Sequence, residues 1–204
     1  MRPPRWQSPE AKALDVGEAR DLLAKVRGHE LEGAVILGMV AGLRVGEVCA
    51  VTWADLDLDT GSLAVRGSYT GPTKSGRTRE LTLPTSEVAA LRRYRKDAAE
   101  RLLRIGVRQG EDSYVVTDPY GRQMRPQTLS GAFGRFARAS GIGLDRFHGL
   151  RHTAAVLMLL SGTDVKTAAS RLGHANPGLL ITTYSHFVRS ADRAAADRLE
   201  SLLG

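Results

Sequence analysis

Apolar residues recur along much of this chain at the three- and four-residue spacing of amphipathic helices. The first predicted helix follows Asp15 and Glu18, whose spacing is that of a capping box, and ends at Gly28. Glycines also follow several of the later apolar stripes, which is the usual place for a helix to stop. Eight further helices are predicted, at residues 31–41, 45–53, 86–105, 127–140, 147–160, 164–172, 177–187 and 190–203.

Strand patterns are few. Residues 62–68 and 78–83 alternate between apolar and polar side chains, and a turn-rich connector separates them, so Lys74 is predicted at or near the tip of a hairpin. Residues 114–117 form a third short strand pattern. We therefore predict an α+β fold, a mainly α-helical domain with one small antiparallel sheet of about three strands.

Residues 1–13 are polar and contain three prolines, so we interpret them as a tail or linker before a single domain at residues 14–204. Cys49 is the only cysteine, which excludes an intrachain disulfide and a cysteine-based zinc site. The longest apolar stretches, 34–40 and 154–160, are too short to span a bilayer, and the N-terminus lacks the apolar core of a signal peptide. The bacterial cytoplasm or nucleoid is the expected location.

The chain of 204 residues has a formal net charge of +7, and 24 of its 29 basic residues are arginines. A polyanionic partner would explain this balance, because arginine binds phosphate through a bidentate fork. A GC-rich genome explains an arginine-, alanine- and glycine-rich composition equally well. Composition by itself leaves both explanations open.

Six dispersed residues have side chains suited to a phosphoryl-transfer site without a metal or other cofactor. Cationic side chains can hold a phosphodiester and stabilise the charge it gains, and a phenol can attack it. These residues are Arg44, Lys74, His148, Arg151, His174 and Tyr184.

Taken singly, each has an ordinary structural explanation. A turn arginine can pair with Glu47, and a histidine can cap a helix or fill the core. His148 and His152 are four residues apart, as in a zinc-binding helix, but Gly149 stands where the metalloprotease motif has glutamate. Asp55, Asp57 and Asp59 begin like a calcium loop without its glycine and glutamate, so a solvated loop is predicted there.

The order and spacing of the motifs resemble those of the tyrosine recombinases, the phage integrase family, over about residues 14–190. The resemblance rests on Ala41-Gly42-Leu43-Arg44-Val45-Gly46-Glu47, the Lys74 hairpin, His148-Gly149-Leu150-Arg151-His152-Thr153, Leu172-Gly173-His174 and Thr183-Tyr184-Ser185-His186.

This resemblance implies a role for each residue. Tyr184 would be the nucleophile that forms a 3′-phosphotyrosyl bond. Arg44 and Arg151 would clamp the scissile phosphate, and His174 would donate a further hydrogen bond to it. His148 would accept the tyrosine proton and Lys74 would protonate the 5′-oxygen. The remaining role implied is that of Glu47, which would orient Arg44.

The resemblance also implies partners, namely double-stranded DNA and further copies of the chain in a homotetramer. Family members have an N-terminal clamp domain, for which the few residues before the first helix leave no room, so this sequence is expected to be the catalytic domain alone. The amphipathic helix predicted at 190–203 would join protomers on DNA or close the protein's own core. Three alternatives stay open: a type IB topoisomerase-like enzyme, a non-catalytic DNA-binding module of the same fold, and an unrelated basic interaction protein.

Overall fold

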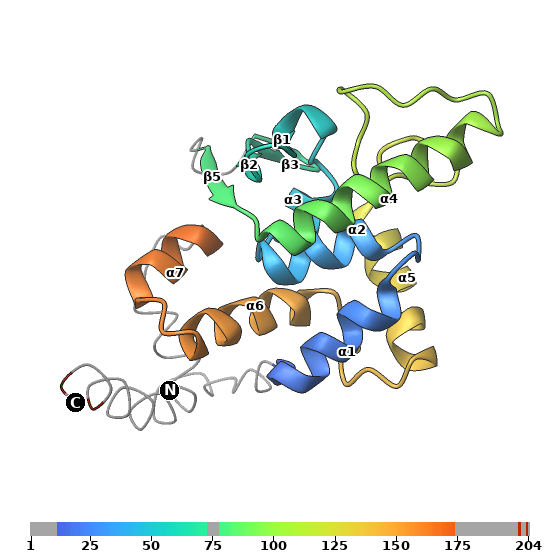
Figure 1. The fold of residues 1–204 in the computed structure, drawn as a ribbon. Coiled ribbons are helices and arrows are strands. Elements are labelled where there is room, and N and C mark those ends of the chain that lie inside the picture. The colour runs from blue at the N-terminus through green and yellow to red at the C-terminus, as the bar shows by residue number, and fades with distance from the viewer. Residues whose placement is uncertain (1–11, 73–77, 174–199, 201–202, 204) are drawn as a thin grey trace, which may run out of the picture.

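The computed structural model describes residues 12–72, 78–173, 200 and 203 (Figure 1). In this view the small sheet lies above a body of helices, with α6 and α1 on the opposite side of that body. Among the described residues the predicted α+β class is confirmed: helices dominate and the largest sheet has three antiparallel strands.

The helices begin and end largely where the sequence signals place them. Asp15 and Glu18 form the predicted capping box of the first helix, and the Asp164 side chain accepts a hydrogen bond from the Thr167 N–H at the start of the last described one. The helical elements are α1 (Val16–Val26), α2 (Glu32–Val35), the π-helix η1 (Ile36–Val40), α3 (Val45–Val48), the 3₁₀-helix η2 (Trp53–Asp55), α4 (Thr85–Leu103), α5 (Pro126–Ala139), α6 (His148–Leu160) and α7 (Val165–Leu172).

The three-stranded sheet has the order β1-β2-β5, with strands β1 (Leu56–Asp57), β2 (Ser62–Val65) and β5 (Arg79–Thr82). Leu63 of β2 lies opposite Leu56 on one side and Leu81 on the other, and all three are buried. A separate two-stranded ribbon, β3 (Gly67–Ser68) and β4 (Gly71–Pro72), precedes residues 73–77. Lys74 lies outside the described residues, so its place at a hairpin tip stays a prediction.

The predicted strand at 114–117 was wrong. That segment makes only isolated bridges, Thr52 with Tyr114 and Thr117 with Gln123. The third strand is β1 instead, within the segment predicted as a solvated aspartate loop. Strand pairing depends on which segments meet in space, and alternation over four residues does not specify the partner.

Two predicted helices are interrupted. The helix predicted at 31–41 changes to a π-helix, in which the Ala41 N–H bonds to the Ile36 carbonyl five residues earlier. The helix predicted at 45–53 stops after one turn. The 3₁₀-helix η2 follows, and its Asp55 side chain accepts hydrogen bonds from the N–H and hydroxyl of Thr52. Apolar side chains are buried on both sides of each break, so hydrophobic spacing alone could not locate it.

Within the part of the chain that the structure describes, two clusters of buried side chains hold the fold together. The larger joins α1, α2, η1, the sheet, α4, α5 and the start of α6, with Trp53, Phe133 and Phe147 among its largest members. The smaller joins the rest of α6 to α7 through residues such as Ala155, Leu159 and Leu172. α7 therefore rests on α6, and it also lies beside β5. No helix among the described residues has the length and apolar character needed to cross a membrane.

Candidate active site

Three arginines distant in sequence converge on the C-terminal end of α7. Arg79 Nε donates to the carbonyl of Arg171 at 3.0 Å, Arg151 Nη2 donates to the carbonyl of Leu172, and Arg44 Nη2 lies 3.3 Å from the carbonyl of Gly173. The last carbonyls of a helix lack partners within the helix and carry partial negative charge. This helix end therefore gathers three cations around one point.

Arg151 is the most deeply buried of the three, with only 4 % of its surface exposed. Besides Leu172, its guanidinium bonds to the Gly42 carbonyl at 2.6 Å from Nη1. Gly42 follows η1, so Arg151 links α6, where it resides, to the end of η1 and the end of α7. Its orientation is fixed by the fold before any ligand arrives, which is what a preorganised anion site requires.

Two glycines make these close approaches possible. Gly42 has φ +69°, and a Cβ there would lie 2.5 Å from Cδ2 of Leu172. Gly173 has φ +65°, and a Cβ there would lie 2.9 Å from Nη1 of Arg79. Both positions have a left-handed backbone, which strains any other residue, and a side chain at either one would displace the Leu172 or Arg79 side chain that it meets.

Glu47 binds two of the arginines from the first turn of α3. Its Oε2 accepts from the backbone N–H of Arg44 at 2.9 Å, and its Oε1 accepts from Arg44 Nη1 at 3.1 Å. Arg79 donates to both oxygens, from Nη1 to Oε1 at 3.0 Å and from Nη2 to Oε2 at 2.8 Å. The predicted contact between Glu47 and Arg44 is therefore present.

Exposure separates the members of this cluster. The side chain of Arg44 is 46 % exposed, that of Arg79 15 % and that of Glu47 only 5 %. Burial raises the pKa of Glu47. The hydrogen bond and charge of Arg79, followed by those of Arg44, lower it by more than burial raises it, so the pKa lies below the ordinary glutamate value of 4.5. Glu47 is thus an anion at neutral pH, and Arg44 is the arginine of this cluster best placed to meet a ligand from solvent.

His148 and His152 lie one turn apart at the start of α6, with ring centroids 4.6 Å apart in an edge-to-face arrangement. Burial is the largest cause that lowers the pKa of His148, and the charges of Arg151 and Arg44 lower it further. His148 is therefore neutral at pH 7 and able to accept a proton. Across the described ranges 12–72 and 78–173, no three histidine, cysteine or acidic side chains gather as a metal site would require.

Acidification should destabilise the fold through His152. Burial first, and then the charges of His148 and Arg151, lower its pKa from 6.5 to about 4. Between these two values the unfolded chain binds the proton and the folded chain does not, so the free energy of unfolding falls as the pH drops from 6.5 towards 4.

Thermal melts of the wild type and a His152→Gln variant across this range measure the effect. The melting temperature of the wild type should fall more steeply with decreasing pH, because the variant lacks the titrating group. Parallel curves for the two proteins would contradict the assignment.

The structure brings together Arg44, Glu47, His148 and Arg151, all predicted from the sequence. The other three predicted residues, Lys74, His174 and Tyr184, lie outside the described residues. Sequence reasoning missed Arg79. Arg79 shares the inward face of β5 with buried Leu81. A basic residue at an apolar position of the strand pattern was the feature of the sequence that could have identified it.

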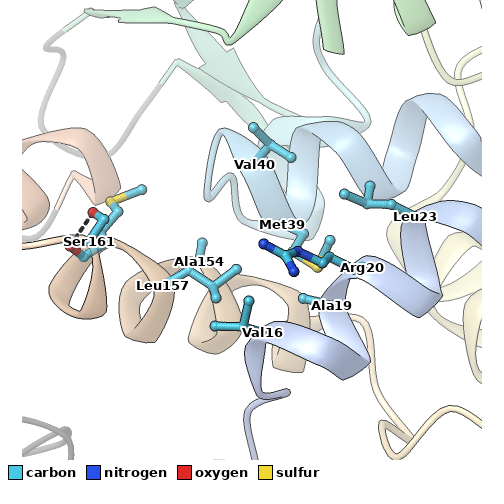
Figure 2. Close-up of a pocket in the computed structure, with 10 residues that line it drawn as sticks. Val16, Ala19, Arg20, Leu23, Met39, Val40, Ala154, Leu157 and Ser161 are labelled. Atoms are coloured by element: carbon cyan, nitrogen blue, oxygen red, sulfur yellow. Dashed lines mark hydrogen bonds between the residues drawn. The ribbon is translucent and has the colours of Figure 1, made fainter. Parts of the chain in front are cut away.

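Away from this site, α1, η1 and α6 line an open, mainly apolar pocket of about 320 Å³ (Figure 2). Figure 2 shows Val16, Ala19 and Arg20 of α1 beside Met39 of η1, with Leu157 of α6 to their left. None of the converging arginines, nor Glu47 or His148, lines this pocket. The candidate chemistry lies instead at the surface formed by α3, β5, α6 and α7.

Curated proteins with similar sequences include recombinases and integrases. The sequence is 24% identical over 214 residues to a tyrosine recombinase XerC-like protein of Caldanaerobacter subterraneus subsp. tengcongensis, covering 95% of this chain and 55% of that protein. It is 26% identical to the ICEBs1 integrase of Bacillus subtilis, covering 82% of this chain and 48% of the integrase. The chain thus spans about half the length of these curated relatives.

Solved structures give the same result. A crystal structure of XerA recombinase superposes with a TM-score of 0.74 at 25% identity, over 97% of this chain and 66% of XerA. The Tn1549 transposon integrase shares the fold, with a TM-score of 0.72 at 21% identity over 96% of this chain and 67% of the integrase. The sequence profile of the phage integrase family matches residues 12–190. This chain therefore belongs to the phage integrase family.

Proposed function

We propose that this protein cuts and rejoins double-stranded DNA at specific sites through a 3′-phosphotyrosyl intermediate on Tyr184. The observation that carries the proposal is the convergence of Arg44 and Arg151 at the end of α7, beside a neutral His148. Family membership supports the substrate class, since the relatives include recombinases and integrases. The Tn1549 integrase was solved in complex with transposon right end DNA.

The arginines supply the charge that the reaction requires. Attack on a phosphodiester places additional negative charge on the non-bridging oxygens, and fixed cationic donors stabilise that charge without reorganising. Arg151 is held rigidly by two carbonyls, and Arg44 presents a partly exposed guanidinium. We assign both to the non-bridging oxygens, with His174 as a further donor.

The proton transfers are assigned to the remaining residues. The Tyr184 oxygen attacks phosphorus as the bond to the 5′-oxygen breaks. His148 takes the phenol proton, and Lys74 gives a proton to the departing 5′-oxygen. The phosphotyrosyl ester retains the free energy of the broken bond, so the 5′-hydroxyl of another strand can reverse the attack without ATP. Neither a metal ion nor another cofactor has a role in these steps.

Covalent capture tests the proposal. The full chain is incubated with a library of nicked duplexes of randomised sequence, from which a cleaved fragment diffuses away and traps the adduct. Denaturant-resistant protein–DNA complexes are then sequenced to recover the site, and peptide mapping should place the DNA on Tyr184. Failure to trap any adduct would overturn the proposal. Relaxation of supercoiled plasmid without exchange between two recovered sites would show a topoisomerase-like activity instead.

Lys74→Ala should slow the cleavage of ordinary DNA far more than that of DNA with sulfur in place of the 5′-bridging oxygen. A thiolate leaves without needing a proton, so the loss of a general acid has little effect on that substrate. Single-turnover cleavage rates on the two substrates measure the difference. Equal defects on both would remove Lys74 from the general-acid role, and Lys96→Ala, on α4, serves as the control lysine variant.

We also propose that the protein acts as a homotetramer on DNA, joined through the predicted helix at 190–203. That helix lies outside the described residues, apart from its positions 200 and 203. Deleting residues 190–204 and measuring folding, cleavage and assembly on the recovered site separates this role from closure of the protein's own core. A truncated chain that folds, cleaves and assembles normally would refute it.

A further inference from the structure

Arg79 is bonded on every side by the protein itself. Its Nη1 and Nη2 donate to the two oxygens of Glu47, its Nε donates to the carbonyl of Arg171, and its side chain is only 15 % exposed. All three guanidinium nitrogens of Arg79 already donate to the protein, so Arg79 has less donor capacity and exposure left for a phosphate than Arg44, whose side chain is 46 % exposed. The task of Arg79 must lie in what it does to its neighbours.

The charge balance shows what that task is. Glu47 carries one negative charge and contacts two cations, Arg44 and Arg79. Arg79 makes the bidentate contact, which is the stronger and more directional form of arginine–carboxylate pairing. Because Arg79 neutralises Glu47, the charge of the more exposed Arg44 is left for an external anion. Without Arg79, Glu47 would cancel the charge of Arg44.

Arg79 also sets geometry. It joins β5 to the end of α7 through the Arg171 carbonyl, and Arg171 returns a bond from its Nη2 to the Thr82 carbonyl of β5 at 3.0 Å. These two reciprocal contacts fix the end of α7 against β5. The same helix end carries the carbonyls that bond to Arg44 and Arg151.

We propose that Arg79 is a positioning residue of the active site. It neutralises and orients Glu47, so that the positive charge of Arg44 is not cancelled and its guanidinium points towards the scissile phosphate. This inference rests on the proposed function, because it concerns the efficiency of the same site. Arg79 itself does not touch the DNA in this scheme.

A double-mutant cycle on cleavage by the full chain tests the proposal. Arg79→Met should slow cleavage about 100-fold, the size of effect that a small misplacement of a catalytic group produces. In an Arg44→Ala background the same change should slow cleavage less than about 3-fold, because residues that act through one another are not additive. A merely structural defect would give the same loss in both backgrounds.

Two further variants guard against misfolding and general charge effects. Arg79→Lys retains the positive charge but cannot make the bidentate contact with Glu47. It should therefore fold normally and cleave DNA about 10-fold more slowly than wild type. Arg122→Met removes another arginine that binds a carboxylate, that of Asp118, from an exposed turn distant from α7, and it should cleave at the wild-type rate. Circular dichroism melts confirm folding for each protein.

A second readout needs no DNA. NMR titration of carbon-13-labelled glutamate side chains, with Glu47→Gln for assignment, should show the Glu47 carboxyl titrating below 4.5 in wild type and Arg122→Met, and higher in Arg79→Met. An unchanged titration in Arg79→Met overturns the inference. So does wild-type cleavage by Arg79→Met, or a full loss in both backgrounds of the cycle. Absence of any adduct from the wild type overturns the proposed function and this inference together.

Discussion

Tyr184→Phe should lose covalent attachment to DNA completely, with a fall in adduct formation on the order of 10⁴ or more, as removal of a catalytic nucleophile produces. Only the phenol oxygen is removed, so the shape and the cationic character of the site remain. DNA binding should therefore stay within about 2-fold of wild type, because phosphate contacts to arginine dominate affinity.

Gel shifts with intact duplex measure the binding, and denaturing gels with nicked duplex measure the adduct. Tyr120→Phe is the matched control: this tyrosine is 66% exposed on a turn away from the arginine cluster, and its loss of a hydroxyl should leave both measurements unchanged. An adduct formed by the Tyr184→Phe variant would show that another residue is the nucleophile.

The two proposed phosphate arginines should differ in what their loss does to the fold. Arg44→Ala and Arg151→Ala should each raise the cleavage barrier by about 3 kcal/mol, the usual loss for one preorganised donor. Arg151→Ala should also lower the free energy of unfolding by about 3 kcal/mol, because the buried carbonyls of Gly42 and Leu172 lose a charged donor. Arg44→Ala should change stability by less than about 1 kcal/mol, since its side chain is 46 % exposed.

Urea unfolding measures stability, and single-turnover rates on nicked DNA measure the barrier. Comparison of the two variants at a temperature where both are folded separates the catalytic loss from the structural one. Normal cleavage by either variant would remove that arginine from the phosphate site. Equal stability of the two variants would show that the carbonyl contacts of Arg151 contribute nothing to the fold.

Helix boundaries could be predicted well where local signals act alone. The Asp15 capping box, the cap at Asp164 and the left-handed stop at Gly173 are contacts within a few residues, so the sequence contains all that is needed. The prediction failed where partners came from elsewhere in the chain. The bridge between Thr52 and Tyr114, and the pairing of β1 with β2, depend on packing that local spacing does not record.

The candidate site followed the same division. Arg44, Glu47, His148 and Arg151 could be named from motif spacing, and the structure places them together. Arg79 could not be assigned from that spacing, because its role depends on a carboxylate 32 positions earlier and a carbonyl 92 positions later. Lys74, His174 and Tyr184 remain predictions from sequence.

The sequence by itself determined the helical periodicity, the caps and the set of phosphate-binding side chains, because each depends on residue type and short spacing. Only the tertiary structure decided how charge is distributed among those side chains. Two arginines lower the pKa of Glu47 despite its burial and so keep it ionised. Arg44 stays partly exposed while Arg79 is mostly buried, and burial lowers the pKa of His148. These properties arise from desolvation and from contacts between α3, β5, α6 and α7, and they exist only once those elements have packed together.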